Sequence, residues 1–477
     1  MSITRNFLFS SVLTVSGYVF PIIVYPHVSR ALGVNNLGIC NFVDSIIDYF
    51  ILVSMLGIAT VGVREIAEAR HDRTMLSRRF LSILLIGGTA TTVALGALIA
   101  CTYTIAALEP YKPLLFIGII KLLGNFLLLD WFYQGIEDFR YITIRTIAVK
   151  TGYAIAVFIW IWNPDDYITY YTLWCLSFGV NALLSCTHIA KSIDFHAGIE
   201  VRRIIRPILI LGLYMLITSM YTTFNTTYLG FEKGDTEVGY YTTASKLLMV
   251  LIGLYTAFTR VMIPRMSALF ASKDFVAFRN LEGKAVGALI AVAVPLITVT
   301  TVFADEIIRL FAGSEFLPAA VPARIIFGLI FVIGYEQIIV LQVLMPMRKD
   351  NALFIGSIVG AAASLTANFL LVPGHASTGS AIAWVVAEVA VLISGQLFIR
   401  RYIRLDFPFR QLAANIGVYL PLAAILLLMW HYMPYPPLVC LIAATLATAI
   451  YATAAQVLVL RNEYALAIIR KVMPFIR

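Results

Sequence analysis

Residues 64–102 of the chain read REIAEARHDRTMLSRRFLSILLIGGTATTVALGALIACT, and this stretch contains both signals that decide the fold. Its first part contains five arginines, whereas residues 81–102 contain no charged side chain. A helix of about 20 apolar residues crosses the ~30 Å hydrocarbon core of a membrane. Short loops rich in Lys and Arg stay on the cytoplasmic side. The stretch therefore predicts a cytoplasmic loop followed by a membrane-spanning helix.

The apolar half of this pattern recurs along the whole chain. Of the 477 residues, 60% are hydrophobic and only 13% are charged, and the mean hydropathy is +0.89. A water-soluble domain of this length does not need so much apolar surface. We therefore predict an all-α membrane protein with about fourteen transmembrane helices, near residues 9–30, 38–61, 81–102, 112–133, 146–162, 167–189, 207–229, 239–259, 285–304, 322–345, 351–372, 378–399, 411–431 and 437–459.

The segments that connect these apolar stretches are alternately rich and poor in Lys and Arg. All but seven of the 35 Lys and Arg lie in eight of the fifteen segments, and these alternate with basic-poor segments from the first to the last. Residues 202–206 and 400–410 are basic, whereas residues 163–166, 232–237 and 305–315 contain more acids than bases. We expect both termini to be cytoplasmic. The net charge of +9 is then an orientation signal that also attracts anionic membrane lipid, and no nucleic-acid partner is expected.

A short pattern that occurs twice suggests that the chain has two related halves. Leu32-Gly33 leads through Gly38 to Arg64, and Leu229-Gly230 leads through Gly239 to Arg265; each arginine follows its second glycine by 26 residues. Two halves related in this way have the same orientation in the membrane. We predict an N-terminal six-helix lobe at 1–195, a second six-helix lobe at 196–405, and a C-terminal helical hairpin with a tail at 406–477. The two lobes would enclose a central cavity and work by alternating access.

The sequence contains no constellation that indicates an enzyme. No phosphate-binding glycine loop and no Ser/His/Asp set with a suggestive context is present. The five cysteines have no metal-ligand spacing and are expected to be small core residues: Cys40, Cys101, Cys175, Cys186 and Cys440. We predict a protein that is not an enzyme and that needs no cofactor and no metal.

Basic residues inside the predicted spans are the first candidates for function. A charge at the middle of a bilayer costs roughly 2.5–3.5 kcal/mol on insertion scales, so it tends to face a partner or water. Lys121 is expected either to face a cavity or to form an internal ion pair. Lys246 is expected to face the cavity or to extend towards the outer surface. Arg30 ends a proline-broken first span and is either a cavity residue or an interfacial anchor.

Acidic and hydroxyl residues inside the spans are the second candidates. Asp44 and Asp48 are four residues apart and share one helix face. They could bind a coupling cation or proton, either H⁺ or Na⁺, or they could pair with Lys121 or Lys246. The seventh span is rich in hydroxyl and amide groups, which would either line water and bind sugar or reflect a helix that is merely rich in Thr. Its candidate sugar-binding residues are Thr223, Asn225 and Tyr228.

Residues 129–145 read LDWFYQGIEDFRYITIR. This stretch resembles the Trp-Phe-x-Gln-Gly-x-Glu-x-Phe…Ile-x-x-Arg signature of bacterial O-antigen and exopolysaccharide repeat-unit flippases (Wzx-type), in the multidrug/oligosaccharidyl-lipid/polysaccharide exporter superfamily. Residues 56–67 and 239–246 fit the same family. The resemblance implies a fold like that of multidrug-extrusion and lipid II flippases. Many flippases of this group have twelve spans, whereas fourteen are predicted here, as in the lipid II branch.

The resemblance also implies a substrate and a location. The substrate would be an undecaprenyl-pyrophosphate-linked oligosaccharide repeat unit. The protein would move it from the cytoplasmic to the periplasmic leaflet of the bacterial inner membrane, for O-antigen or exopolysaccharide assembly alongside other polysaccharide assembly proteins. A basic residue early in the eighth span belongs to the family pattern, and Lys246 occupies that place.

These inferences combine into one hypothesis about the residues. Arg30, Lys121 and Lys246 bind the pyrophosphate, and the hydroxyls and amide of the seventh span bind sugar. Arg64 and Arg265, at equivalent places in the two halves, form an intracellular gate. Two alternatives remain open: a cation-coupled multidrug exporter of the same fold, whose cavity would be acidic, and a membrane polysaccharide polymerase, which would have a large external loop.

Overall fold

The structure is a computed structural model, and it describes residues 3–189, 193–347, 349–403, 405–432 and 436–460. Within these ranges the chain forms helices joined by short connections and contains no strand. It divides into two compact units, Met1–Thr242 and Thr243–Arg477. Each unit is described by itself. The lobe boundaries predicted near residues 195 and 405 stay predictions.

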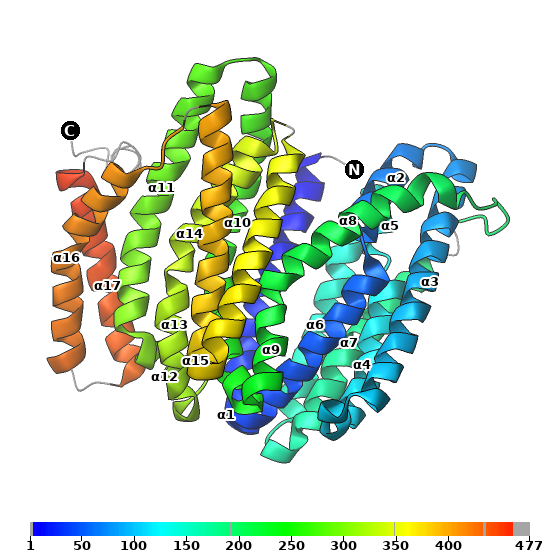
Figure 1. Ribbon diagram of the computed structural model, residues 1–477, viewed down its shortest axis with the longest axis horizontal. Coiled ribbons are helices and arrows are strands. Elements are labelled where there is room, and N and C mark those ends of the chain that lie inside the picture. The colour runs from blue at the N-terminus through cyan, green and yellow to red at the C-terminus, as the bar shows by residue number, and fades with distance from the viewer. Residues whose placement is uncertain (1–2, 190–192, 348, 404, 433–435, 461–477) are drawn as a thin grey trace. The chain divides into compact units, whose positions relative to one another are not determined.

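The first unit contains nine α-helices, the start of a tenth and two short 3₁₀ turns (Figure 1). Neighbouring helices pack along much of their length, above all α4 against α7 and α1 against α3, α4 and α6. The elements are α1 (Ile3–Met55), α2 (Ile58–Ala69), α3 (Arg73–Thr104), η1 (Ala106–Tyr111), α4 (Lys112–Leu127), α5 (Asp130–Gly135), α6 (Phe139–Trp160), η2 (Pro164–Asp166), α7 (Tyr167–Ile189), α8 (Val201–Thr222), α9 (Phe224–Lys233) and the start of α10 (Asp235–Ala271).

Helix α1 is two helices joined at a single residue. It has 53 residues, and a straight helix of that length would be about 80 Å long, more than twice the ~30 Å of a bilayer core. The chain turns at Gly33, whose φ of 74° and ψ of 173° are non-helical. Glycine has no Cβ and adopts positive φ without strain. Gly33 therefore lies in the loop predicted between the first two spans.

Hydrogen bonds and ion pairs gather basic segments at one end of the first unit. Arg70, before α3, forms an ion pair with Glu137, in the turn after α5. Arg78 Nε donates to the main-chain carbonyl of Ala197 at 3.2 Å. These contacts join three segments that are widely separated in sequence and that are all rich in Lys and Arg.

In the same unit, the basic-poor segments contact one another and not the basic segments in the hydrogen bonds that follow. Asn36 Nδ2 donates to the carbonyl of Pro164 at 2.9 Å. The Tyr111 hydroxyl donates to Asp235 Oδ2 at 2.8 Å. Each pair joins two basic-poor segments, so the alternation in the sequence corresponds to two sets of loops that meet separately.

The second unit contains the rest of α10 and seven further α-helices. Among them, α15 has 53 residues and, like α1, turns at one residue, Ala376 (φ 46°, ψ −127°). Arg279 Nη2 donates to the carbonyl of Ile403 at 2.8 Å and joins two basic segments. The elements are α11 (Phe275–Val302), α12 (Ala304–Phe311), η3 (Ser314–Ala319), α13 (Ala320–Phe327), α14 (Leu329–Gln337), the π-helical turn η4 (Ile338–Leu344), α15 (Asp350–Tyr402), α16 (Phe409–Tyr432), α17 (Pro437–Ala454) and the π-helical turn η5 (Ala455–Val459).

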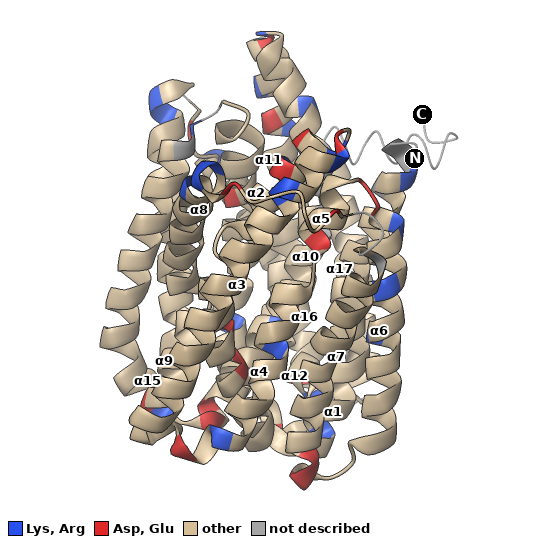
Figure 2. Cartoon of the chain, turned by 90° about the vertical axis from the view of Figure 1, so that its right-hand side faces the viewer, with Lys and Arg blue, Asp and Glu red and all other residues tan. Residues whose placement is uncertain are grey.

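Ten segments within the described part of the chain are long and apolar enough to cross a membrane. Two of them contain the kinked helices α1 and α15. The number of fourteen spans stays a prediction. Figure 2 shows that Lys, Arg, Asp and Glu lie mostly towards helix ends and in connections, with long uncharged stretches between them. A charged side chain within such a stretch therefore stands out against its surroundings.

Candidate functional site

The stretch around Trp131 packs into the first unit through two glycines. A Cβ on Gly62, in α2, would lie 2.7 Å from Cε3 of Trp131, in α5. A Cβ on Gly135 would lie 2.6 Å from the Cβ of Ile66. Only glycine permits such close approach. The stretches at residues 56–67 and 129–145, which both resemble the flippase family, therefore pack against each other where α2 meets α5. This contact is called the α2–α5 joint below.

Two buried ion pairs flank this joint. Arg79 Nη1 lies 2.7 Å from Glu65 Oε2, and both side chains are 6% exposed. Arg145 forms an ion pair with Asp130, the first residue of α5. Arg145 Nε also donates to Asn181 Oδ1 at 2.7 Å. A buried charge pair is stable only when its hydrogen bonds are well formed, so these pairs fix the positions of the helices that carry them.

The candidate functional site is centred on Lys121, in α4. Its Nζ lies 2.7 Å from Asp44 Oδ1 and 2.7 Å from Asp48 Oδ1, both in the second part of α1. Trp174 Nε1, in α7, donates to the same oxygen of Asp44 at 3.3 Å. The four-residue spacing of the two acids places both on the face of α1 that meets α4. Lys121, Asp44, Asp48 and Trp174 are called the Lys121 cluster below.

Aromatic rings enclose the ammonium group of this cluster. Lys121 Nζ lies 5.9 Å from the ring centroid of Trp174 and 5.4 Å from that of Phe178, both within cation–π range. The Lys121 side chain is only 5% exposed, whereas the side chains of Asp44 and Asp48 are 23% and 43% exposed. The cluster is therefore accessible through Asp48 rather than through the lysine.

The charges of the cluster do not balance. One ammonium faces two carboxylates, so the cluster has a formal charge of −1 when all three groups are ionised. An ammonium group has three N–H donors, and the two carboxylates accept two of them. Uncompensated charge away from water is costly. The arrangement is therefore suited to taking up a proton or a monovalent cation at Asp48.

The predicted seventh span divides into α8 and α9, and its polar residues lie in three different settings. Asn225 is fully buried and donates to the Tyr241 hydroxyl at 3.2 Å. Tyr228 is half-buried and stacks on Phe224, with ring centroids 5.4 Å apart. Thr223 lies at the junction of α8 and α9. The structure therefore places these three predicted sugar-binding residues together on one segment, with Asn225 turned into the protein.

Polar contacts connect this segment to the helix that carries Asp44 and Asp48. The hydroxyls of Ser45 and Thr227 lie 2.8 Å apart. Asn41 Nδ2 donates to Thr242 Oγ1, in the first part of α10, at 3.0 Å. One side of the second part of α1 is thus polar along its length, which an apolar lipid environment would not favour.

The remaining predicted residues lie apart from the Lys121 cluster or in the other unit. Arg30 is exposed, and its Nη1 donates to the carbonyl of Pro26 at 2.6 Å. Arg64 is 55% exposed and lies 3.6 Å from Glu65 Oε1. In the second unit, Lys246 is half-buried and Arg265 is exposed. Anion binding by Arg30 and Lys246 and gating by Arg64 and Arg265 stay predictions.

A carboxyl pair in the second unit has no assigned role from the sequence. Glu336, in α14, and Glu388, in α15, are hydrogen-bonded neighbours, and Trp384 Nε1 donates to Glu388 Oε1 at 2.9 Å. Both glutamates are recognisable in the sequence as acids inside predicted spans. Their pairing is not, because they are 52 positions apart and lie on different helices.

Within the described residues, no group of three or more His, Cys, Asp and Glu side chains could hold a metal ion. The carboxylates of the Lys121 cluster offer only two acidic residues, with a lysine between them. The chemistry available there is the exchange of a proton or a weakly held monovalent cation.

Comparison with known proteins identifies a family and relatives that match most of the chain. A family model described as "Polysaccharide biosynthesis protein" matches residues 3–270. A protein of Escherichia coli (strain K12), described as "Putative O-antigen transporter", is 22% identical over 411 residues, which cover 84% of this chain and 97% of the relative. A protein of Shigella dysenteriae with the same description is 24% identical over 403 residues, covering 82% and 98%.

Solved structures show the same fold. The lipid II flippase MurJ in an inward-closed conformation matches with a TM-score of 0.75 at 13% identity, covering 94% of this chain and 99% of that structure. An inward-facing multidrug resistance transporter of the MATE family and MOP superfamily matches with a TM-score of 0.63 at 16% identity, covering 80% and 93%. The predicted all-α membrane-transporter fold is confirmed.

Proposed function

Since the chain belongs to the family of polysaccharide biosynthesis proteins, we propose that it is a flippase for a polyprenyl-pyrophosphate-linked oligosaccharide. The substrate would be an undecaprenyl-pyrophosphate-linked repeat unit, moved from the cytoplasmic to the periplasmic leaflet of the inner membrane by alternating access. Two curated relatives described as O-antigen transporters support O-antigen or exopolysaccharide assembly as its setting. Both termini would be cytoplasmic, in line with the positions of the basic segments.

The observation that carries the residue assignment is the Lys121 cluster, a buried ammonium group between two carboxylates. Because Trp174 and Phe178 cover the ammonium group, its third N–H donor binds one phosphate oxygen after these rings turn aside. Adding a doubly charged pyrophosphate to a cluster of formal charge −1 would concentrate negative charge around one lysine. Neutralising Asp48 by H⁺ or Na⁺ removes part of this repulsion. We therefore infer that the pyrophosphate and the coupling cation bind cooperatively, with Lys121 contacting both Asp48 and the substrate.

The other predicted residues complete this binding mode. Arg30 and Lys246 supply further positive charge to the pyrophosphate, and Thr223, Asn225 and Tyr228 bind the first sugars. Arg64 and Arg265 form the intracellular gate. The membrane potential supplies the direction of transport, because moving one net negative charge outward across 100 mV yields about 2.3 kcal/mol.

A cation-coupled multidrug exporter is the second candidate, and one observation favours it. The Lys121 cluster has more acids than bases, and an organic cation could bind next to Asp48 where a pyrophosphate would not. The exporter fold of the multidrug transporters is compatible with this function too. The membrane polysaccharide polymerase is a third, weaker candidate, since the relatives with a description are transporters.

The deciding experiment is translocation of a fluorescent undecaprenyl-pyrophosphate-linked oligosaccharide in proteoliposomes, with Lys121→Ala as the test variant. We expect about a tenfold or greater loss of the translocation rate, because a phosphate hydrogen bond and a charge interaction are both lost. Lys112→Ala is the matched control: Lys112 is also in α4, but it lies at the helix start and pairs with Glu109.

Two further measurements, a triple variant and an assay of organic-cation efflux, distinguish the possible causes of a loss of translocation. A triple variant, Lys121→Met with Asp44→Asn and Asp48→Asn, has no buried charge and so separates loss of binding from failure to fold. Equal translocation by wild type and Lys121→Ala would refute the role of Lys121. Efflux of an organic cation, with no movement of the lipid-linked sugar, would instead favour the multidrug exporter.

A further inference from the structure

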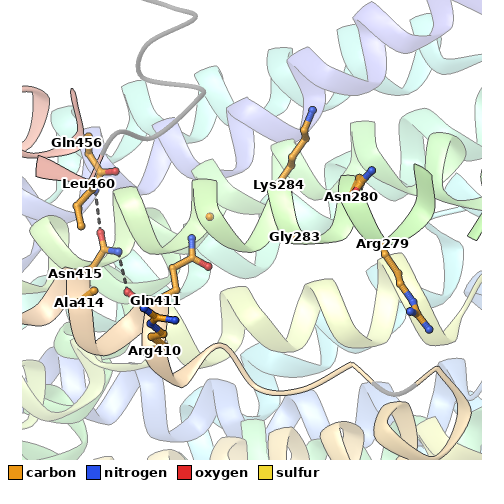
Figure 3. A pocket seen from close by; sticks show the side chains of 11 residues that line it. Arg279, Asn280, Gly283, Lys284, Arg410, Gln411, Ala414, Asn415, Gln456 and Leu460 are labelled. Carbon is orange, nitrogen blue, oxygen red and sulfur yellow. Dashed lines mark hydrogen bonds between the residues drawn. The ribbon is translucent and has the colours of Figure 1, made fainter. Parts of the chain in front are cut away.

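A pocket of about 890 Å³ lies within the second unit, between α11 on one side and α16 with η5 and Leu460 on the other (Figure 3). The Lys121 cluster belongs to the first unit. Its lining residues are Arg279, Asn280, Gly283, Lys284, Gly287, Arg410, Gln411, Ala414, Asn415, Gln456 and Leu460.

The lining is strongly cationic. Arg279, Lys284 and Arg410 give it three positive charges, and none of the described lining residues is acidic. Figure 3 shows Arg279 and Lys284 extending to opposite sides of α11, and Arg410 beside Gln411 at the start of α16. Because Arg279 also binds the carbonyl of Ile403 at 2.8 Å, one of these cations is held in place by the main chain. Such a pocket selects an anion.

Amide side chains form a rigid wall beside the cations. Gln456 Nε2, in η5, donates to Asn415 Oδ1 at 2.9 Å, and Asn415 Nδ2 donates to the carbonyl of Gln411 at 2.9 Å. Asn415 and Gln456 are 5% and 6% exposed. Their hydrogen bonds tie η5 to α16 and hold this wall of the pocket in place. Arg410 and Gln411 are in the first turn of α16, where the helix dipole also favours an anion.

The surroundings of the pocket are suited to lipid. Large apolar side chains are exposed on all three of its walls: Val292 on α11, Ile416 and Leu420 on α16, and Leu458 and Val459 on η5. Val292, Ile416 and Leu420 are about two to three helical turns along their helices from the nearest charged lining residue. Leu458 and Val459 lie between the lining residues Gln456 and Leu460. The basic segments at 271–284 and 400–410, which supply the cations, are predicted to face the cytoplasm. Basic pockets between transmembrane helices on this side bind the head groups of anionic lipids.

We propose that this pocket is a binding site for the phosphate head group of an anionic phospholipid of the cytoplasmic leaflet, with the acyl chains lying along the exposed apolar faces of α16 and η5. Lys284 and Arg410 contact the phosphate, and the amides of Gln411 and Asn280 bind the glycerol or head-group hydroxyls. The ligand adds a bridge between α11 and α16, which also pack directly on each other.

The test is native mass spectrometry of the full-length protein, purified in detergent and titrated with dioleoyl phosphatidylglycerol or with dioleoyl phosphatidylcholine. Wild type should retain phosphatidylglycerol and not phosphatidylcholine. The double variant Lys284→Ala with Arg410→Ala should bind phosphatidylglycerol roughly tenfold more weakly, since it loses two phosphate contacts. The charge-matched control Arg400→Ala with Arg401→Ala removes two exposed cations from a neighbouring segment and should bind within about twofold of wild type.

A second variant tests the pocket without changing charge. A Cβ on Gly283 would meet no atom within 4 Å, so Gly283→Leu places a side chain in the pocket without a clash. We expect it to weaken phosphatidylglycerol binding as strongly as the double variant does. Its control is Gly152→Leu, on α6, where a Cβ also meets nothing. Unchanged lipid retention in Gly283→Leu would overturn the proposal.

A competition experiment distinguishes a phospholipid site from a general site for phosphate. Inorganic pyrophosphate, which represents the head of the proposed substrate, should leave phosphatidylglycerol retention unchanged, because the soluble anion lacks acyl chains. Displacement of the lipid by pyrophosphate at equal concentration would show a general phosphate site and would overturn the assignment to phospholipid. This result is independent of translocation, so the lipid site and the proposed flippase function can fail separately.

Discussion

Gly62 lies directly beneath the ring of Trp131: a Cβ at position 62 would be 2.7 Å from Cε3 and 2.9 Å from Cδ2 of the indole. The ring is 4% exposed and stacks on Phe80 at a centroid distance of 5.5 Å. It therefore has no space into which to move. A segment whose sequence resembles a functional signature is, in this structure, a packing contact between α2, α3 and α5.

Substitution of Gly62 should destabilise the protein. In Gly62→Ala the new methyl group overlaps the indole, and overpacking of this kind costs about 1–3 kcal/mol. We expect a lower thermal unfolding midpoint for the purified protein. Gly96→Ala is the matched control, because a Cβ at Gly96, in α3, meets no atom within 4 Å. Equal midpoints for the two variants would contradict the close contact.

Arg145 should be important for folding rather than for transport chemistry. Its side chain is 2% exposed and pairs with Asp130. Arg145→Leu leaves Asp130 without its partner; since the Asp130 side chain is 30% exposed, the cost is smaller than the roughly 3–5 kcal/mol of a fully buried pair. We expect a loss of folded protein, measured by the monodisperse fraction after purification. Adding Asp130→Asn should restore part of it, whereas Arg140→Ala, at an exposed position, should have little effect.

The two acids of the Lys121 cluster should respond differently to neutralisation. Asp44 is less exposed than Asp48 and also accepts a hydrogen bond from Trp174. Asp44→Asn should therefore lower thermal stability more than Asp48→Asn. Asp48→Asn should keep translocation but remove its dependence on the coupling cation.

Translocation assays of Asp48→Asn in the presence and absence of Na⁺, and at about pH 6 and about pH 8, measure this dependence. Wild type should change about tenfold with the coupling cation, and the variant less than about twofold. A variant that remains fully cation-dependent would place the coupling site elsewhere, with the Glu336 and Glu388 pair as the next position to test.

Cysteine labelling should report two sides of the membrane in the first unit. His71 and His196 are exposed in basic segments that contact each other through Arg78 and Ala197. Asp165 is exposed in a basic-poor segment. In a variant without native cysteines, His71→Cys and His196→Cys should react with an impermeant maleimide only in inside-out vesicles, and Asp165→Cys only in intact cells. Labelling of all three from one side would contradict the topology.

Asp166 should make stability in the connection before α7 depend on pH. Backbone N–H groups of Trp162 and Asn163 donate to its carboxylate and lower its pKa below the ordinary 3.8. Since the folded-state pKa is depressed, the stabilisation is present above the unfolded-state pKa and is lost as pH falls through the folded-state pKa. The difference in unfolding midpoint between wild type and Asp166→Ala should shrink from about pH 7 to about pH 3. Asp165→Ala is the control for the removal of one exposed acid from the same connection.

The sequence was sufficient for the fold class because membrane helices are specified locally. The length of an apolar run and the position of Lys and Arg relative to it do not depend on tertiary contacts. The contacts of Asn36 with Pro164 and of Arg78 with Ala197 agree with that alternation. The sequence also predicts a loop between the first two spans, and the chain turns within it at Gly33. The exact number of spans was harder to read, since α1 and α15 each run through a kink as one long helix.

The site was only partly predictable, because pairing is a tertiary property. Charge at mid-membrane singled out Lys121, Asp44 and Asp48, and an ion pair among them was one of two interpretations left open. The structure brings these three together. The partnership of Arg145 with Asp130 and the cationic pocket at Lys284 and Arg410 had no sequence signal, since each depends on helices that meet only after folding.

The turn at Gly33 has a mechanical consequence for the first two spans. A turn made by one residue supplies only two soft dihedral angles, so the two parts of α1 can pivot about each other but have no spare chain with which to slide apart. Asp44 and Asp48 lie near the middle of the second part of α1, which runs from Gly33 to Met55. This part has about 22 residues and is ~33 Å long, and a rotation of roughly 10° about Gly33 moves its far end by about 6 Å. We therefore expect a change of charge at Asp44 and Asp48 to displace the end of this part at the opposite face of the membrane.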